Sequence, residues 1–245
     1  MTAPVFVCPL DEAVRAGTLV ELSGPEGRHA ARVRRLQPGE RVDLVDGGGT
    51  RAAGRVHDVR GETVVVEVTA VAVDPEPEPR LVVVQALPKG DRGELAVEVL
   101  TEVGVDVIVP WQAERSVVQW RDERGAKARS RWDATAREAG KQARRARFPE
   151  VAPLASTADV AALLATASLG AVLSEESDEP LAEARVPEAG DVVVVVGPEG
   201  GIAPGEELAM RAAGATTYRL GPSVLRTSTA GVVAAAVLLS RSPRW

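Results

Sequence analysis

The protein has 245 residues, of which 45% are hydrophobic and 26% charged, and its formal net charge is −6. This composition supports one or two domains with a buried core, and no apolar run reaches the roughly 20 residues of a membrane-spanning helix. The single cysteine, Cys8, excludes an intrachain disulfide and favours a reducing cytoplasm, and the first residues lack the pattern of a signal peptide. Because only His29 and His57 occur, without a Cys/His cluster, we expect no metal site.

The first part of the chain is rich in short β-prone runs, at residues 5–7, 41–45, 52–56 and 63–73. Glycine and proline turns separate these runs, and closely spaced short strands predict a small β-barrel over residues 1–73. The sequence DPEPEPR at 74–80 follows. Alternating prolines and acids cannot form a strand ladder, so this stretch is predicted to be an extended linker.

From residue 81 the pattern changes to strands that alternate with helices. Continuous apolar runs predict strands that are buried on both faces, whereas apolar residues three or four apart predict helices. Asp91 and Glu94 form a capping-box pattern, and Gly214 ends a helical stretch. The alternation predicts an α/β domain over 81–245 with a mostly parallel sheet. The expected strands are 81–87, 105–109, 171–173, 192–196 and 217–220, and the expected helices are 91–103, 130–147, 204–213 and 228–240.

Positive charge is concentrated in one stretch of this acidic protein. Residues 114–147 contain eleven Arg or Lys and five Asp or Glu, a local charge of +6. Coulomb interactions are screened beyond about 8–10 Å, so a local basic face can hold phosphates although the whole chain is negative. The charge distribution is therefore compatible with a nucleic-acid partner.

Two loops at strand ends carry the candidate chemistry. GPEGG at 197–201 directly follows a run of valines, and LGPSVLRTSTAG at 220–231 follows the last predicted strand. In open parallel sheets, ligands bind beyond the carboxyl ends of strands, and glycines let the backbone approach them. An ordinary strand-to-helix turn and a solvated Arg226 are the structural alternatives, with Thr227 or Ser228 capping the helix that follows. Neither loop is a dinucleotide fingerprint or a P-loop.

The ordered pair of loops closely resembles the RsmE family of the SPOUT superfamily. Other stretches resemble the same family across nearly the whole chain, namely EGRHAARVRRLQPGERVDLVDGGG at 26–49, ALPKGDRGELAVEVLTEVGVDVIVP at 86–110, ERSVV at 114–118 and AREAGKQARR at 136–145. The resemblance implies an N-terminal PUA-like RNA-binding barrel at 1–73. It also implies a C-terminal SPOUT α/β domain at 81–245 that contains a deep trefoil knot.

The same resemblance implies an activity and a cofactor. The family methylates N3 of uridine 1498 in 16S ribosomal RNA of the small ribosomal subunit, uses S-adenosyl-L-methionine (SAM), and acts as a cytoplasmic homodimer. The positions that match its cofactor site are Leu173, Ser174, Gly197, Pro198, Glu199, Gly200, Gly201, Leu220, Gly221, Leu225, Arg226 and Thr227.

Methyl transfer to uracil N3 requires loss of a proton and stabilisation of the resulting anion. Arg226 is the expected catalytic residue, because a planar cation matches an anion that is spread over O2, N3 and O4. Glu199 and Glu175 are candidates for the base, with solvent as the alternative. The expected RNA-binding residues are Arg32, Arg34, Arg35, Lys89, Arg92, Lys141, Arg144 and Arg145.

Three positions depart from the family pattern. Ser223 and Ser228 replace an arginine and a glutamate, and Ala203 replaces the usual Ser or Thr at a helix start. These departures keep open a non-catalytic RNA-binding protein. A SPOUT ribose 2′-O-methyltransferase also stays open, because GPEGG-type loops occur in that group too. Cofactor binding distinguishes the enzymes from the binding protein, and the modified atom distinguishes the two enzymes.

Overall fold

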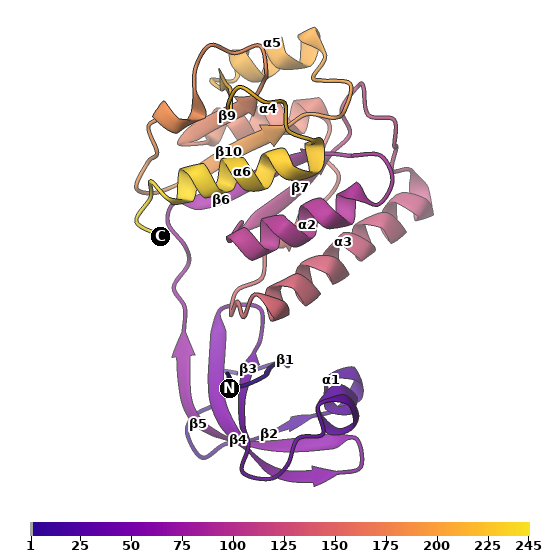
Figure 1. Ribbon diagram of the computed structural model, residues 1–245, viewed down its shortest axis with the longest axis vertical. Coiled ribbons are helices and arrows are strands. Elements are labelled where there is room, and N and C mark those ends of the chain that lie inside the picture. The colour runs from indigo at the N-terminus through magenta and orange to yellow at the C-terminus, as the bar shows by residue number, and fades with distance from the viewer. Residues whose placement is uncertain (1) are drawn as a thin grey trace. The chain divides into compact units, whose positions relative to one another are not determined.

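The computed structural model describes residues 2–245, which form two compact units (Figure 1). The first unit contains the chain up to Glu76 together with the distant segment Gly140–Phe148, and the second contains Pro77–Ala139 and Pro149–Trp245. Within residues 2–245, no helix is both long enough and apolar enough to cross a membrane.

The first unit is built on a five-stranded mixed sheet. Strand β1 runs parallel to β3, and the other neighbours are antiparallel, in the order β1-β3-β4-β5-β2. The β-rich character predicted for this part of the chain is confirmed, although the predicted strand 52–56 is only the middle of a longer one. The strands are β1 (Val5–Val7), β2 (Leu19–Leu22), β3 (Arg41–Val45), β4 (Thr50–Arg60) and β5 (Thr63–Val73).

The core of this unit follows from alternation along the strands. Val42 and Leu44 of β3 are fully buried, and they pack in one cluster with alternating residues of β4 and β5. Strand β4 is irregular at two points, after Ala53 and after Val56. A Cβ at Gly54 would lie 2.6 Å from Cγ1 of Val66, so only glycine fits between the strands at the first of them.

Two short helical turns in this unit were not predicted. Helix α1 (Gly24–Arg28) continues directly into the π-helical turn η1 (His29–Val33). Ala30 of this segment is fully buried in the core, while the arginines that follow it are exposed. Each turn has five residues, which is too short to show a helical period in the sequence.

The second unit has a six-stranded sheet in which every neighbouring pair is parallel, in the order β11-β9-β10-β6-β7-β8. The two central strands, β10 and β6, carry the longest valine runs, which agrees with burial on both faces. The mostly parallel sheet predicted from the sequence is thus confirmed. The strands are β6 (Arg80–Ala86), β7 (Val107–Trp111), β8 (Glu150–Val151), β9 (Leu169–Leu173), β10 (Asp191–Val196) and β11 (Thr216–Tyr218).

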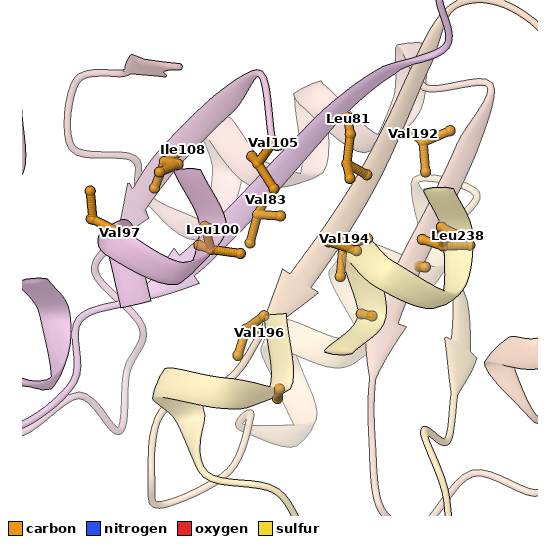
Figure 2. Close-up of a cluster of buried hydrophobic side chains, with 14 of the residues drawn as sticks. Leu81, Val83, Val97, Leu100, Val105, Ile108, Val192, Val194, Val196 and Leu238 are labelled. Carbon is orange, nitrogen blue, oxygen red and sulfur yellow. The ribbon is translucent and has the colours of Figure 1, made fainter. Parts of the chain in front are cut away.

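Helices cover both faces of this sheet. Leu81 and Val83 belong to a cluster with residues of α2 (Arg92–Val103), α3 (Asp122–Gln142) and α6 (Thr227–Leu239), part of which Figure 2 shows. Val82 and Val84 point the other way, into a cluster with residues of α4 (Thr157–Thr166) and α5 (Pro204–Ala212). Helix α6 is apolar and lies against the sheet, as expected for a buried helix.

Several predicted boundaries were wrong. The basic helix expected at 130–147 is α3, which begins at Asp122 and ends at Gln142, because Arg144 adopts a φ of 58° and turns the chain. The Asp91 side chain makes no capping hydrogen bond to α2. Helix α4 was missed, although Ser156 and Asp159 form a complete capping box at its start.

Candidate active site

A cavity of about 770 Å³ lies at the carboxyl ends of β9, β10 and β11 in the second unit. Parallel strands bring these ends to one edge of the sheet, which is where α/β proteins bind ligands. Every position predicted to contact the cofactor lines this cavity. These positions are Leu173, Ser174, Gly197, Pro198, Glu199, Gly200, Gly201, Leu220, Gly221, Leu225, Arg226 and Thr227.

The loop 197–201 turns tightly after β10 because it is rich in glycine. A Cβ at Gly197 would lie 2.8 Å from Cγ1 of Ile202, so a larger residue would push that side chain aside. Gly201 has a φ of 73°, a conformation that costs other residues energy, and its N–H donates to the Pro198 carbonyl at 2.9 Å. The loop therefore brings its backbone close to the cavity, and Glu199 is its only charged side chain there.

The chain after β11 runs alongside the segment that follows β9. The Ser174 N–H donates to the Tyr218 carbonyl at 2.9 Å, and the Arg219 N–H donates to the Glu179 carbonyl at 2.8 Å. The Leu181 N–H in turn donates to the Arg219 carbonyl at 2.9 Å. These bonds hold the entrance of the loop 220–226 and leave its glycine, Gly221, with open space beside its Cα.

The start of α6 differs from the prediction. Arg226, not Thr227 or Ser228, occupies the N-cap position, and no side chain caps the helix. The hydroxyl of Thr227 instead donates to the carbonyl of Gly197. Thr227 thus joins the two predicted loops, a role that requires the ends of β10 and β11 to be close together.

The guanidinium of Arg226 is exposed at the cavity. Its backbone carbonyl accepts from the N–H groups of Thr229 and Ala230, both at 2.9 Å, so the main chain of Arg226 is fixed by the helix. Within residues 2–245, the guanidinium itself makes no hydrogen bond or ion pair. A cation on a fixed backbone is therefore available to a bound molecule.

The two base candidates have different surroundings. Oε1 of Glu199 accepts from the N–H of Lys89 at 3.1 Å, so this carboxylate already ties the loop 197–201 to the end of β6. Glu175 is exposed and lines the same cavity.

Sequence reasoning assigned no role to Arg115 or Glu206. Arg115 lies in the recognised ERSVV motif, lines the cavity, and donates from Nη1 to the Gly200 carbonyl at 3.1 Å. Glu206 is buried in the first turn of α5, three residues after Ala203. The ERSVV motif was the available signal for Arg115, whereas the partners of Glu206 come from distant parts of the chain.

The predicted RNA-binding residues are divided between the units. In the first unit Arg32, Arg34 and Arg35 are exposed, with Arg32 3.8 Å from Glu62. In the second unit Lys89 is exposed, and the half-buried Arg92 lines the cavity.

The structure contradicts a phosphate-binding role for Lys141. This side chain is 6% exposed, and its Nζ lies 2.6 and 2.8 Å from the two carboxylate oxygens of Glu26. Arg144 and Arg145 are half-buried, and Arg144 donates to the carbonyl of Ala3. The end of the basic stretch is thus part of the interior of the first unit. A buried lysine such as Lys141 needs a paired carboxylate, and Glu26 provides it.

Comparisons with known proteins match both units to known domain families. Residues 75–239 match the RNA methyltransferase domain family, and residues 22–69 match the RNA methyltransferase PUA domain. Ribosomal RNA small subunit methyltransferase E of Mycobacterium bovis is 42% identical over all of this chain and 94% of its own length. The Bacillus subtilis protein of the same name is 28% identical over 94% of this chain and 93% of its own.

Solved structures give the same result. The Neisseria gonorrhoeae ribosomal RNA small subunit methyltransferase E, bound to SAM, superposes with a TM-score of 0.85 at 28% identity and 98% coverage of each chain. A Legionella pneumophila protein in complex with the bound cofactor SAM gives a TM-score of 0.86 at 27% identity and 99% coverage of each chain.

Fold, cavity and comparisons define an RNA methyltransferase with an N-terminal PUA domain and a C-terminal α/β domain of the SPOUT type. The chain belongs to the ribosomal RNA small subunit methyltransferase E family, RsmE, as its motifs predicted.

The residues around the cavity fit SAM. Residues of three strand-end loops line the cavity and can bind an adenosine, and the space beside Gly221 is open. SAM carries positive charge on its sulfur and its amino group, and carboxylates at the cavity wall attract such charge. These carboxylates belong to Glu175, Glu176, Glu199 and Glu207.

Proposed function

We propose that this protein transfers the methyl group of SAM to N3 of uridine 1498 in 16S ribosomal RNA of the small ribosomal subunit. The observation that carries the proposal is the convergence of three strand-end loops on one cavity that Arg226 lines. Family membership supports the reaction class, because relatives that match all or 94% of the chain are named ribosomal RNA small subunit methyltransferase E.

SAM, when bound, supplies an electrophilic methyl group on a positively charged sulfur. The task of the chain is to hold this group in line with the nucleophile, and positioning of this kind lowers the barrier without a metal. The Thr227 hydroxyl and the glycines of loop 197–201 keep the two loops together on one side of the cavity. A base held in this cavity has to be turned out of any stack in the RNA.

Arg226 provides the positive charge of the reaction. Uracil N3 becomes a good nucleophile once its proton has left, and the anion then carries charge on O2 and O4. The guanidinium of Arg226 is free of protein partners within the described residues and can donate to one of these oxygens. Oε1 of Glu199 already accepts from the Lys89 N–H, so Oε2 of Glu199, the carboxylate of Glu175 or solvent would accept the N3 proton.

The proposal also covers the partners of the protein and its location in the cell. We expect the exposed arginines Arg32, Arg34 and Arg35, with Lys89 and Arg92, to contact RNA phosphates in a cytoplasmic ribosomal subunit. A homodimer is expected as well, with α6 near the interface. In support, Val233 remains 37% exposed on a helix that is otherwise largely buried.

Nucleoside mass spectrometry tests the proposal. Small-subunit RNA from a deletion strain is digested, with and without the protein added back, and the position and type of methylated uridine are determined. We expect N3-methyluridine at 1498 to vanish on deletion and to return with the protein. Methylation of a ribose 2′-oxygen instead would favour the other enzyme, and an unchanged methylation pattern in a strain that lacks the protein would contradict both.

A further inference from the structure

The GPEGG loop, residues 197–201, is held from the side opposite to the loops after β9 and β11. Strand β10 lies next to β6, and β6 lies next to β7, all parallel, so the loops after these strands meet at one edge. The Lys89 N–H, after β6, donates to Glu199, and the Arg115 guanidinium, after β7, donates to the Gly200 carbonyl, both at 3.1 Å. The loops after β6 and β7 thus form hydrogen bonds with two successive residues of GPEGG, Glu199 and Gly200.

The backbone of Arg115 also touches the loop. A Cβ at Gly200 would lie 3.4 Å from Cβ of Arg115 and 3.6 Å from its carbonyl oxygen. These are ordinary van der Waals distances, so Arg115 lies directly beside the GPEGG loop at Gly200. Arg115 is exposed, so its hydrogen bond to Gly200 competes with water and depends on where the main chain holds the side chain.

Glu206 fixes that main chain. Oε1 of this carboxylate accepts from the N–H of Glu114, the residue before Arg115, at 2.9 Å. Its Oε2 accepts from the N–H of Ala203, just after the GPEGG loop, at 3.2 Å. One carboxylate, itself 6% exposed, therefore binds the Arg115 loop and the end of the GPEGG loop together.

A third donor completes the surroundings of Glu206. The Thr157 hydroxyl at the start of α4 donates to Oε1 at 2.8 Å, and Nε1 of the buried Trp111 donates to that hydroxyl oxygen at 3.3 Å. Loss of any one of these three donors would leave a buried carboxylate oxygen less well satisfied, which costs free energy. Glu206 therefore connects the loop after β7 and the starts of α4 and α5 through hydrogen bonds.

We propose that Arg115 and Glu206 are positioning residues of the methyltransferase, which hold the GPEGG loop in the form that binds SAM. This inference rests on the proposed function for its ligand, since SAM is the molecule that the loop would bind. Arg115 acts through the Gly200 carbonyl, and Glu206 acts through the main chain at Glu114 and Ala203.

Substitutions of Arg115 test the first contact. Arg115→Ala should weaken SAM binding about fivefold to tenfold, the equivalent of one hydrogen bond of about 1–1.4 kcal/mol, as measured by calorimetry on the full chain. Arg115→Lys should restore most of the affinity, because the Gly200 carbonyl needs a single donor. The KM for SAM should rise while kcat at saturating SAM changes less than threefold. Arg185→Ala, an exposed arginine outside the cavity, is the matched control.

Glu206→Gln tests the hydrogen bonds of the Glu206 carboxylate. The amide oxygen can replace one carboxylate oxygen, but the amide NH₂ then faces an N–H group, so one hydrogen bond is replaced by a repulsion. We expect SAM affinity to fall more than tenfold. In a ¹⁵N NMR spectrum, the Trp111 indole resonance should shift through Thr157, and the Gly200 and Gly201 amides should shift in both Glu206→Gln and Arg115→Ala.

The outcomes separate this inference from the function on which it rests. If wild-type protein binds SAM and Arg115→Ala binds it equally well, with unshifted Gly200 and Gly201 amides, the positioning role is wrong and the proposed function stands. If wild-type protein does not bind SAM, the proposed function fails, while the NMR shifts still report whether Arg115 holds the loop. A lowered melting temperature with unchanged SAM affinity in Glu206→Gln would make Glu206 a purely structural residue.

Discussion

Arg226, the proposed catalytic residue, is held at the cavity by the helix that it begins. Its carbonyl accepts from the N–H groups of Thr229 and Ala230, so the backbone is fixed, while the residue lines the cavity and its guanidinium has no protein partner in the described chain. Ser223 and Ser228 depart from the family pattern, yet Ser228 is buried at the start of α6 and does not line the cavity. Of the two departures, the one at Ser223 lies at the cavity wall.

We predict that Arg226→Ala lowers kcat by roughly 10²–10³, the range for loss of one donor to a developing anion. SAM affinity should change far less, because many residues besides Arg226 line the cavity. Arg226→Lys should rescue only part of the rate, since an ammonium lacks the planar fork. Single-turnover methylation of small-subunit particles, alongside SAM titration, measures both. A defect that lies entirely in weaker SAM binding would make Arg226 a structural residue.

Among the elements, the chain after α6 ends in a buried ion pair that secures the sheet. The guanidinium of Arg244 lies 2.6 Å from Oδ2 and 3.1 Å from Oδ1 of Asp106, and it also donates to the Gly104 carbonyl at 2.9 Å. Asp106 accepts in addition from the Leu81 N–H at 2.8 Å. The pair therefore connects the C-terminal residues to the starts of β6 and β7.

Arg244→Ala should lower the free energy of unfolding by about 3 kcal/mol, because it leaves the Asp106 carboxylate buried without its cation. Chemical denaturation at pH 7 measures the change, and Arg241→Ala, on an exposed neighbour, is the control. An effect equal to that of the control would show that solvent reaches Asp106 freely.

The turn between β3 and β4 depends on an ionised carboxylate. Oδ1 of Asp46 accepts from the N–H groups of Gly48 and Thr50, at 2.7 and 2.9 Å. Partial burial would raise the pKa of Asp46, but hydrogen bonds from Thr50, Gly48 and Gly49 outweigh it and hold the pKa below 3.8. The charged form is thus the one that the fold stabilises.

A pH dependence follows from this direction. The contribution of Asp46 is fully present above about pH 4 and is lost as the pH falls through its lowered folded value. Asp46→Asn should therefore destabilise the first unit at pH 7, and its difference from wild type should shrink below pH 4. Urea unfolding across pH 3–7 measures the difference, with the exposed Asp178→Asn as control. A difference that is constant with pH would contradict the role of the charge.

For the molecule as a whole, the acidic net charge of −6 predicts that local arginines contact the RNA phosphates. Arg34→Gln and Arg35→Gln should each flatten the dependence of log affinity on log salt by about one unit for every phosphate that the arginine neutralises. Lys141→Gln should leave that slope unchanged and lower stability instead, because Lys141 is buried against Glu26. Binding of small-subunit RNA at several salt concentrations distinguishes these outcomes, and a slope that is unaffected by the arginine changes would make them plain surface charges.

Local sequence determined the features that have a short repeat or a defined motif. Valine runs predicted β6 and β10, because a strand buried on both faces needs apolar residues at every position. Glycine loops after such strands predicted which residues surround the cavity, since parallel strands end at a common edge. Short elements such as α1 and η1 were not predicted, because five residues are too few to show a helical period in the sequence.

Tertiary structure alone decided which distant groups meet. Nothing local in residues 140–148 indicates that they pack with the first unit, or that Lys141 pairs with Glu26, 115 positions away. Thr227 looked like a helix cap, but its hydroxyl has the Gly197 carbonyl within reach once β10 and β11 lie in one sheet. Glu206 likewise gains its partners only when three loops converge. Such roles depend on long-range contacts, and a buried polar group takes the partner that the fold supplies.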